Sequence, residues 1–320
     1  MRNKAGDLLS PQEIQALTQR SDLAGGWAVI ESWGLIALAF ALAALFRNPL
    51  AWLVAALILG SRQLALAILM HEAAHTTLMR NRFLNEFCGE WLGAAPVFQN
   101  LPMYRKHHLQ HHRQTGTGDD PDLSLATAFP VSPRSLRRKL LRDITGLTGL
   151  KTLLGSVLML VGYLQYDASG GQRGPGGGPR RGRANLRTAV SGLGPVLVMQ
   201  ALLLAVLAQL GVAQLYLLWL LAYLTVFQLL LRIRSIAEHA MTTDPDDALN
   251  NSRTTLTRAW ERLLYAPLNV NYHLEHHMLA AVPFHRLPAM HRLLEARGVF
   301  AQPAAVASSY AQVLRMAARG

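Results

Sequence analysis

Four long apolar segments dominate the pattern of hydrophobic and polar positions along the chain. They run near residues 27–46, 50–70, 191–210 and 212–231. Each is close to the roughly 20 residues that an α-helix needs to cross the hydrocarbon core of a bilayer. Only "RNP" separates the first two segments, and a single glycine separates the last two. The pattern therefore predicts an all-α integral membrane protein whose four transmembrane helices form two hairpins.

A fifth apolar stretch, residues 144–166, carries Lys151 near its middle and several glycines. If it crossed the membrane, the basic C-terminal half of the chain would move to the opposite side. We therefore interpret it as an interfacial or re-entrant helix pair. The segment that follows, residues 169–183, reads "SGGQRGPGGGPRRGR". Such a composition cannot bury a core, so we expect a flexible loop there.

Composition and charge support a membrane protein. The chain is 51% hydrophobic and 16% charged, whereas soluble domains are about one-quarter charged. Its net charge is +12, and the basic residues gather in the N-terminal, middle and C-terminal polar regions. By the positive-inside rule these regions, and hence both termini, are cytoplasmic, which means a plasma or inner membrane if the source is bacterial. The Gly-rich stretch lacks interleaved aromatic residues, which favours anionic lipid over nucleic acid as a partner.

The N-terminus and the cysteine content exclude other classes. The first residues are polar and lack the apolar core of a signal peptide. One cysteine, Cys88, excludes an internal disulfide framework and a cysteine-ligated zinc module. Arg62 lies inside the second apolar segment, with Glu31 at a similar depth in the first. Two arrangements are open for this costly charge: an ion pair with Glu31, or a side chain that extends to the interface.

Most of the 12 histidines sit in three short motifs. The stretch "LMHEAAHTTL" (69–78) contains His-Glu-x-x-His, the spacing of zinc metalloproteases, and also the looser His-x-x-x-His. HLQHH (108–112) and HLEHH (273–277) each place histidines at i, i+3 and i+4, so that three rings share one face of a helix. His239 lies about two helical turns beyond the fourth apolar segment.

Because the spans return these motifs to one side of the membrane, we expect nine imidazoles to converge on a metal site. The candidate ligands are His71, His75, His108, His111, His112, His239, His273, His276 and His277. One zinc protease site needs three protein ligands and a water, so nine suit two ions with open positions for oxygen. Neutral imidazoles bind iron, copper and zinc.

Carboxylates near the motifs are expected to orient the rings by accepting their second N–H. The candidates for this second layer are Asp120, Asp122, Glu238, Glu275 and Glu72. Glu72 is thereby interpreted as a neighbour of the ligands rather than as the base of a protease. We expect His107, which falls outside the HLQHH frame, and His285 and His291, which lie in a proline-containing segment, not to bind metal.

These motifs together resemble the membrane fatty acid desaturase and hydroxylase superfamily. The matching pieces are HEAAH (71–75), HLQHH followed by "DDPDL" (119–123), "RIRSIAEH" (232–239) and "NYHLEHHMLAAVPFHRLP" (271–288). The resemblance extends from about residue 27 to residue 294. One departure is "HHMLAAVPF", where relatives often carry a proline after the paired histidines.

The resemblance implies a four-span fold capped on the cytoplasmic side by a helical domain, with two iron ions held by the nine histidines. It also implies O2 as a co-substrate, a lipid or acyl chain as the substrate, and no catalytic residues beyond the metal ligands. We expect no fused redox domain, so electrons come from a separate ferredoxin-, rubredoxin- or cytochrome-type carrier. The chain then divides into a cytoplasmic segment (1–26), a desaturase-like membrane domain (27–294) and a cytoplasmic tail (295–320).

The leading hypothesis is an O2-dependent acyl-lipid desaturase with a di-iron centre. The ligand set does not distinguish it from a hydroxylase or ketolase that acts on a carotenoid, sphingolipid or alkyl chain. A membrane zinc protease that uses His71, Glu72 and His75 is a more distant alternative. A metal- or lipid-binding membrane protein without enzymatic activity is another.

Overall fold

The computed structural model describes residues 5–168, 181–242, 244, 246–301 and 305–320, and it is predominantly helical. Most of the predicted Gly-rich loop (169–183) lies outside the described residues. The helices before that loop are α1 (Ala5–Leu8), α2 (Pro11–Leu17), α3 (Asp22–Leu45), α4 (Pro49–Ala74), α5 (Arg82–Phe87), the π-helix η1 (Cys88–Ala94), η2 (Ala95–Val97), α6 (Leu101–Gln114), α7 (Leu123–Thr127), α8 (Pro133–Ile144) and α9 (Leu147–Leu160).

The second half of the chain is also mainly helical and adds two short strands. Its elements are α10 (Leu186–Gln209), α11 (Leu215–Ala222), the π-helix η3 (Tyr223–Phe227), α12 (Gln228–His239), β1 (Thr254–Thr255), α13 (Ala259–Leu264), η4 (Pro267–Asn269), α14 (His273–Met278), α15 (Leu287–Ala296), η5 (Val299–Ala301), β2 (Val306–Ala307) and α16 (Tyr310–Ala317).

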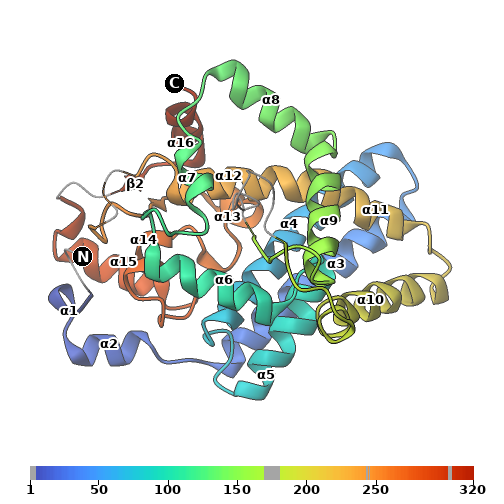
Figure 1. The fold of residues 1–320 in the computed structure, drawn as a ribbon, viewed down its shortest axis with the longest axis horizontal. Coiled ribbons are helices and arrows are strands. Elements are labelled where there is room, and N and C mark those ends of the chain that lie inside the picture. Colours follow the sequence, from blue (N-terminus) through green and yellow to red (C-terminus); the bar gives the residue numbers. More distant parts are fainter. Residues whose placement is uncertain (1–4, 169–180, 243, 245, 302–304) are drawn as a thin grey trace.

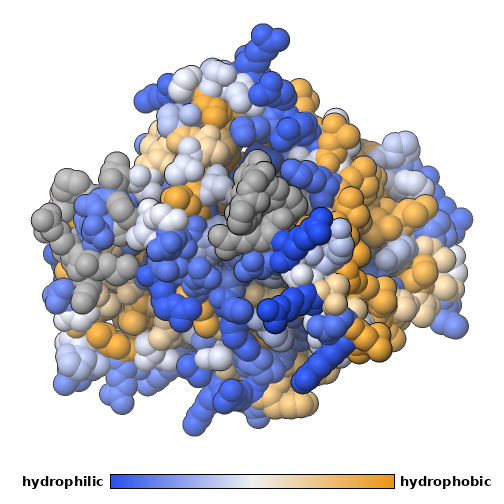
Figure 2. Space-filling view, viewed as in Figure 1, coloured by the Kyte–Doolittle hydropathy of each residue, from blue (hydrophilic) through white to orange (hydrophobic). Residues whose placement is uncertain are grey.

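Four helical runs among the described residues are long and apolar enough to cross a membrane: α3, α4, α10 and the continuous run of α11, η3 and α12. Short loops join α3 to α4 and α10 to α11. Many outward side chains are large and apolar; Leu186, Leu202 and Leu217 are exposed. Figure 2 shows apolar residues gathered on the side of the molecule formed by α9, α10 and α11 (compare Figure 1). The prediction of a mainly helical fold with four candidate membrane spans is confirmed.

The fifth apolar stretch, residues 144–166, contains the helix α9, and a sharp bend separates α9 from the helix before it. α8 ends at Ile144, α9 begins at Leu147, and the two helices are bent by 65°. Gly146 between them has a φ of +82°, in the left-handed region that glycine adopts without strain. In Figure 1, α9 runs across the direction of α11 and α12. The bent pair thus consists of α8, which precedes the predicted stretch, and α9 within it, so a helix pair inside 144–166 is not what the structure contains. By length and composition α8 and α9 together qualify as a broken fifth span, and the interfacial position stays a prediction.

The C-terminal residues are built into the fold. β2 pairs in parallel with β1, so that Val306 lies opposite Thr254. Tyr310 and Val313 of α16 share a hydrophobic cluster with Ile236 of α12, as expected for two positions three residues apart on one helix face. The residues predicted as a tail therefore include a strand and a helix that pack against the end of the fourth span.

Arg62 finds a partner that the sequence did not suggest. Its side chain is buried, and its guanidinium donates to Ser61 Oγ at 2.9 Å and to the backbone carbonyl of Leu263. In the part of the chain that the structure describes, Arg62 forms no ion pair with Glu31, so that predicted arrangement is wrong. A carbonyl at the end of α13 offers the buried charge a nearer acceptor.

α9 packs closely against the π-helix of the fourth span. A Cβ atom built on Gly149 would stand 2.2 Å from the carbonyl oxygen of Leu224 in η3. Gly155, later on the same helix, has open space around its own Cβ position. The approach of α9 to η3 therefore depends on the absence of a side chain at Gly149.

Gly149→Ala should destabilise the folded protein, because forcing an extra carbon into a close contact costs about 1–3 kcal/mol. Gly155→Ala should be neutral or stabilising, since alanine is favoured over glycine inside a helix by about 1 kcal/mol. Both are measured as the apparent unfolding temperature of the detergent-purified protein. Equal shifts for the two variants would contradict the close packing of α9 on η3.

Candidate metal centre

The first pair of histidines stands at the end of α4. His71 belongs to the last turn, and His75 is the residue that caps the helix. The helix ends there because Thr76 has a φ of +58° and the Thr77 amide turns back to the carbonyl of Glu72. The i, i+4 spacing directs both rings to one side, and their centroids lie 5.1 Å apart.

The HLQHH motif lies in α6. Asn100 caps this helix by accepting a hydrogen bond from the Met103 amide, which satisfies one of the free N–H groups of the first turn. His108 and His111 are buried and His112 is half-buried. The predicted i, i+3, i+4 arrangement therefore brings three rings to one side of α6.

The remaining four histidines come from the last third of the chain. His239 is the final residue of α12, and its Nδ1 lies 3.4 Å from the backbone carbonyl of Asn251. His273, His276 and His277 belong to the short helix α14. The end of the fourth span and a helix more than thirty residues later thus meet at one place.

Five of the nine rings form what we call the five-histidine group. Its members are His71, His75, His108, His112 and His276, and each offers a nitrogen that lies within 4.8 Å of those of the others. Nε2 of His108 is 2.9 Å from Nε2 of His75 and 3.1 Å from Nε2 of His112. Nε2 of His276 is 3.0 Å from Nε2 of His112.

The other four rings form the four-histidine group, which consists of His111, His239, His273 and His277. Nε2 of His239 lies 3.2 Å from Nε2 of His111 and 2.8 Å from Nε2 of His273. His277 offers a nitrogen within 4.8 Å of those of His111 and His239. The two groups touch, since the rings of His112 and His277 stack with their centroids 4.1 Å apart.

The nitrogen positions suit a transition metal in each group. Imidazole nitrogens bind such ions at about 2.1 Å, and two of them at right angles around one ion would be about 3 Å apart. The close Nε2 pairs lie at 2.8–3.2 Å. Both nitrogens of His71 and Nε2 of His277 are buried and find no hydrogen-bond partner among the described residues, which is costly unless another group binds them. The residues present therefore fit two metal ions.

Burial keeps the rings in the neutral form that binds metal. Burial, with repulsion from His111 and Arg105, lowers the pKa of His75 to about 4. Burial also holds the pKa values of His108, His112 and His276 well below the usual value for histidine. Since a protonated ring cannot bind a metal, the site is ready to bind one at neutral pH.

His111 differs from its neighbours because a carboxylate holds its outer nitrogen. Burial lowers its pKa, but the hydrogen bond to Asp120 and the charge of Asp122 outweigh burial, so the net shift is upward. Asp120 Oδ1 lies 2.8 Å from His111 Nδ1, which leaves Nε2 to face the four-histidine group. Glu238 stands 3.4 Å from His273 Nδ1. These carboxylates lie where the sequence predicted second-layer groups.

His107 lies outside both histidine groups. Its Nε2 is 2.8 Å from Asp122 Oδ1, and these two residues and Asp167 bring donor atoms within 4.8 Å of one another. Asp122 therefore contacts His107 more closely than it contacts His111, whose Nδ1 is 3.8 Å away.

Two further predicted carboxylates hold chain segments together. Glu72 accepts hydrogen bonds at Oε2 from the Thr77 hydroxyl (2.8 Å) and the Phe284 amide (3.1 Å), while its Oε1 stands 3.4 Å from His71 Nδ1. Glu275 contacts Nδ1 of His291 and accepts from the hydroxyl of Thr254. Glu275 thus joins α14 to α15 and to β1.

Three residues at the site were missed at the sequence level. The Tyr104 ring stacks on His108, with centroids 5.1 Å apart. Arg105 bonds both carboxylate oxygens of Glu86 and the carbonyl of Ala73, which ties α6 to the end of α4. The Thr115 hydroxyl lies 3.3 Å from His277 Nδ1. Tyr104 is four residues before His108, so the helical repeat could have predicted their contact. No sequence pattern indicated the role of Arg105.

Comparison with known proteins identifies the family. Residues 47–306 match the model of the fatty acid desaturase family, which is most of the 320-residue chain, and the chain belongs to that family. The resemblance predicted from the histidine motifs is therefore confirmed. A relative, the dihydrorhizobitoxine desaturase of Bradyrhizobium elkanii, is 30% identical over 249 residues, which are 73% of this chain and 65% of the relative. The matched part thus spans just under two-thirds of that protein's length.

The two histidine groups lead to a stoichiometry that can be measured. The metal-loaded protein should hold two transition-metal ions per chain. His276→Ala removes a ring from the five-histidine group and His277→Ala one from the four-histidine group, so each should lower the content toward one ion. His285→Ala, outside both groups, is the matched control. Metal is quantified by plasma mass spectrometry, and full occupancy in both ligand variants would contradict the assignment.

Asp120→Asn should weaken metal binding at the four-histidine group by about 10–100-fold, the usual effect of losing a carboxylate behind a ligand ring. Asp119→Asn changes the exposed neighbour and should leave affinity unchanged. Competition with a chelator measures both. An equal effect of the two substitutions would show that the Asp120 contact to His111 does not tune the metal.

Proposed function

We propose that this protein is an O2-dependent membrane desaturase of a lipid acyl chain, with two irons held by the nine histidines. The observation that carries the proposal is the pair of largely buried imidazole groups that meet beside the ends of two membrane-length helices, α4 and the run that ends in α12. Membership of the fatty acid desaturase family supports it. So does the similarity to a protein named as a desaturase.

The irons, when bound and reduced, supply the activation of O2 and the abstraction of hydrogen from an unactivated C–H bond. The residues of the chain hold and shield that chemistry. Asp120 fixes the tautomer of His111 by accepting from Nδ1, and Glu238 stands behind His273. Arg105 holds α6 against α5 through Glu86 and against the end of α4 through the Ala73 carbonyl. Burial of the ligands excludes water, which protects a reactive oxidant from side reactions.

The proposed membrane arrangement places the metal centre and both termini in the cytoplasm. It rests on the clustering of Lys and Arg in the polar regions and on the positive-inside rule. Electrons would then come from a separate cytoplasmic carrier of the ferredoxin, rubredoxin or cytochrome type. The same proposal divides the chain into a cytoplasmic segment (1–26), a membrane domain (27–294) and a C-terminal cytoplasmic region (295–320). The C-terminal region packs against the membrane domain through α16 and α12.

A hydroxylase or ketolase on the same scaffold is the second candidate, because the same ligands serve both outcomes. The name of the relative favours desaturation. A zinc protease is disfavoured by Glu72, since its Oε2 already accepts two hydrogen bonds, from Thr77 and Phe284. It is disfavoured also by the number of rings, which exceeds the three protein ligands of such a site.

The reaction is decided by product mass. Membranes that contain the protein, supplied with O2, a reduced carrier and an acyl-lipid pool, should yield lipids that have lost two hydrogens. Gain of one oxygen would replace the proposal with the hydroxylase. The variant His112→Ala is the control and should abolish either product. Unchanged turnover in that variant would refute the role of the histidine groups.

A further inference from the structure

The helix α8 presents a basic face to the outside of the molecule. Its fully buried side chains, Leu136 and Asp143, point to the interior. The outward side carries four exposed arginines, Arg134, Arg137, Arg138 and Arg142. Spacings of three and four residues place them on one broad side of the helix. With Leu141 they line an open concavity that reaches the bend between α8 and α9, and we call this surface the arginine face.

No carboxylate lines the arginine face in the part of the chain that the structure describes. None of its four arginines takes part in an ion pair with another described residue. The acidic residue of α8, Asp143, is buried on the opposite side, where it is bonded to Arg232 of α12. Because like charges that lie close together raise the local potential, this face favours an anionic partner.

Packing on the inner side holds the arginine face outward. Asp143 Oδ1 accepts a hydrogen bond from Nη2 of Arg232 at 2.9 Å. Leu136 belongs to a buried hydrophobic cluster that includes Ile236 of α12. Rotation of α8 would separate this ion pair and leave a buried charge without its partner, which is strongly unfavourable. The exposure of the arginines is therefore built into the fold.

Apolar side chains continue from the arginine face onto α9. Leu141 and Ile144, near the end of α8, are exposed. On α9, exposed Leu147, Leu150 and Leu154 repeat at i, i+3 and i+7, so they share one side of a helix that packs on the fourth span. Figure 2 shows hydrophilic residues over α8 and apolar residues toward α9 and α10 (compare Figure 1). Basic residues beside a continuous apolar strip are typical of a helix on a membrane surface.

We infer that α8 lies along the membrane surface and that its arginine face binds the head groups of anionic phospholipids in the surrounding bilayer. A guanidinium matches a phosphate with two parallel hydrogen bonds, and an anionic leaflet attracts basic helices. Leu141 and Ile144 enter the acyl region beside those head groups. The inference concerns membrane attachment, so it holds for a desaturase and for a hydroxylase alike.

An acidic soluble protein is the other partner that such arginines attract. The apolar strip favours lipid over protein. It begins at Leu141, among the arginines, and continues along α9, which packs on a membrane-length run of helix. A single bilayer therefore covers both the strip and the arginine face, whereas a soluble protein would cover the arginines alone.

The test uses the full chain in nanodiscs of phosphatidylcholine with a trace of phosphatidylglycerol that carries a photoreactive diazirine in its head group. After illumination and chymotryptic digestion, labelled peptides are quantified by tandem mass spectrometry. Residues 133–147 should carry the label, and unlabelled phosphatidylglycerol should compete for it better than phosphatidylcholine. Arg137→Gln combined with Arg138→Gln should lower this labelling by at least about fivefold, since each basic residue near an anionic surface contributes about that gain in binding.

The control variants separate this surface from general charge and folding effects. Arg286→Gln combined with Arg292→Gln removes two exposed arginines at α15, away from α8 in Figure 1, and should leave the labelling of residues 133–147 unchanged. Arg137→Lys combined with Arg138→Lys keeps both charges and should retain most of the labelling. The apparent unfolding temperature shows whether each variant is folded.

Three results would overturn the inference. The first is equal competition by phosphatidylglycerol and phosphatidylcholine, which would show that charge does not matter. The second is labelling that survives the loss of Arg137 and Arg138. The third is a double variant that keeps its labelling but loses affinity for an acidic ferredoxin in surface plasmon resonance, since the arginine face would then be a docking site for a protein.

Discussion

The contact of nine imidazoles, five of them buried and four half-buried, is the interaction on which the rest of this structure depends. Buried polar nitrogens are unfavourable unless each finds a partner or an ion, and neither nitrogen of His71 has a hydrogen-bond partner among the described residues. Four separate helices, α4, α6, α12 and α14, carry these rings. Their relative positions are therefore constrained at one point, and a shift of any of them would separate nitrogens that now lie about as far apart as two ligands of one ion.

Contacts just outside the histidine groups hold those helices in place. Arg105 bonds Glu86 on α5 and the Ala73 carbonyl at the end of α4, so α4, α5 and α6 are fixed to one another. Glu72 receives the Phe284 amide from the segment after α14, and Glu275 contacts Thr254 of β1. Carboxylates beside the ligands thus serve two purposes. Some orient rings, and others join distant parts of the chain around them.

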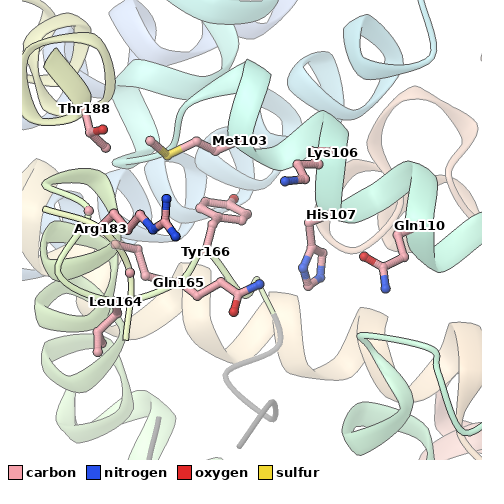
Figure 3. Close-up of a pocket in the computed structure, with 12 residues that line it drawn as sticks. Met103, Lys106, His107, Gln110, Leu164, Gln165, Tyr166, Arg183 and Thr188 are labelled. Carbon is pink, nitrogen blue, oxygen red and sulfur yellow. The ribbon is translucent and has the colours of Figure 1, made fainter. Parts of the chain in front are cut away.

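α6 combines two chemical surfaces on one helix. One face presents the metal-site imidazoles, and burial lowers the pKa values of two of them, His108 and His112. The other presents Lys106 and Gln110 to an open pocket (Figure 3). The helical repeat makes this division possible, because side chains three or four residues apart share a face and those between them do not. Imidazoles and a cationic side chain can therefore lie close together on one helix while facing different surroundings.

The sequence by itself determined the four spans, the short connections within each pair and the three histidine motifs, because these features are local. Hydrophobic length and i, i+3, i+4 spacing are set within one helix and need no knowledge of its neighbours. The tertiary structure alone decided how the nine rings divide, with His276 in one group and its neighbours His273 and His277 in the other. It also decided that Arg62 bonds a carbonyl of α13 rather than Glu31. Those outcomes depend on how helices far apart in the chain are rotated against each other, and no periodicity within a single helix encodes that rotation.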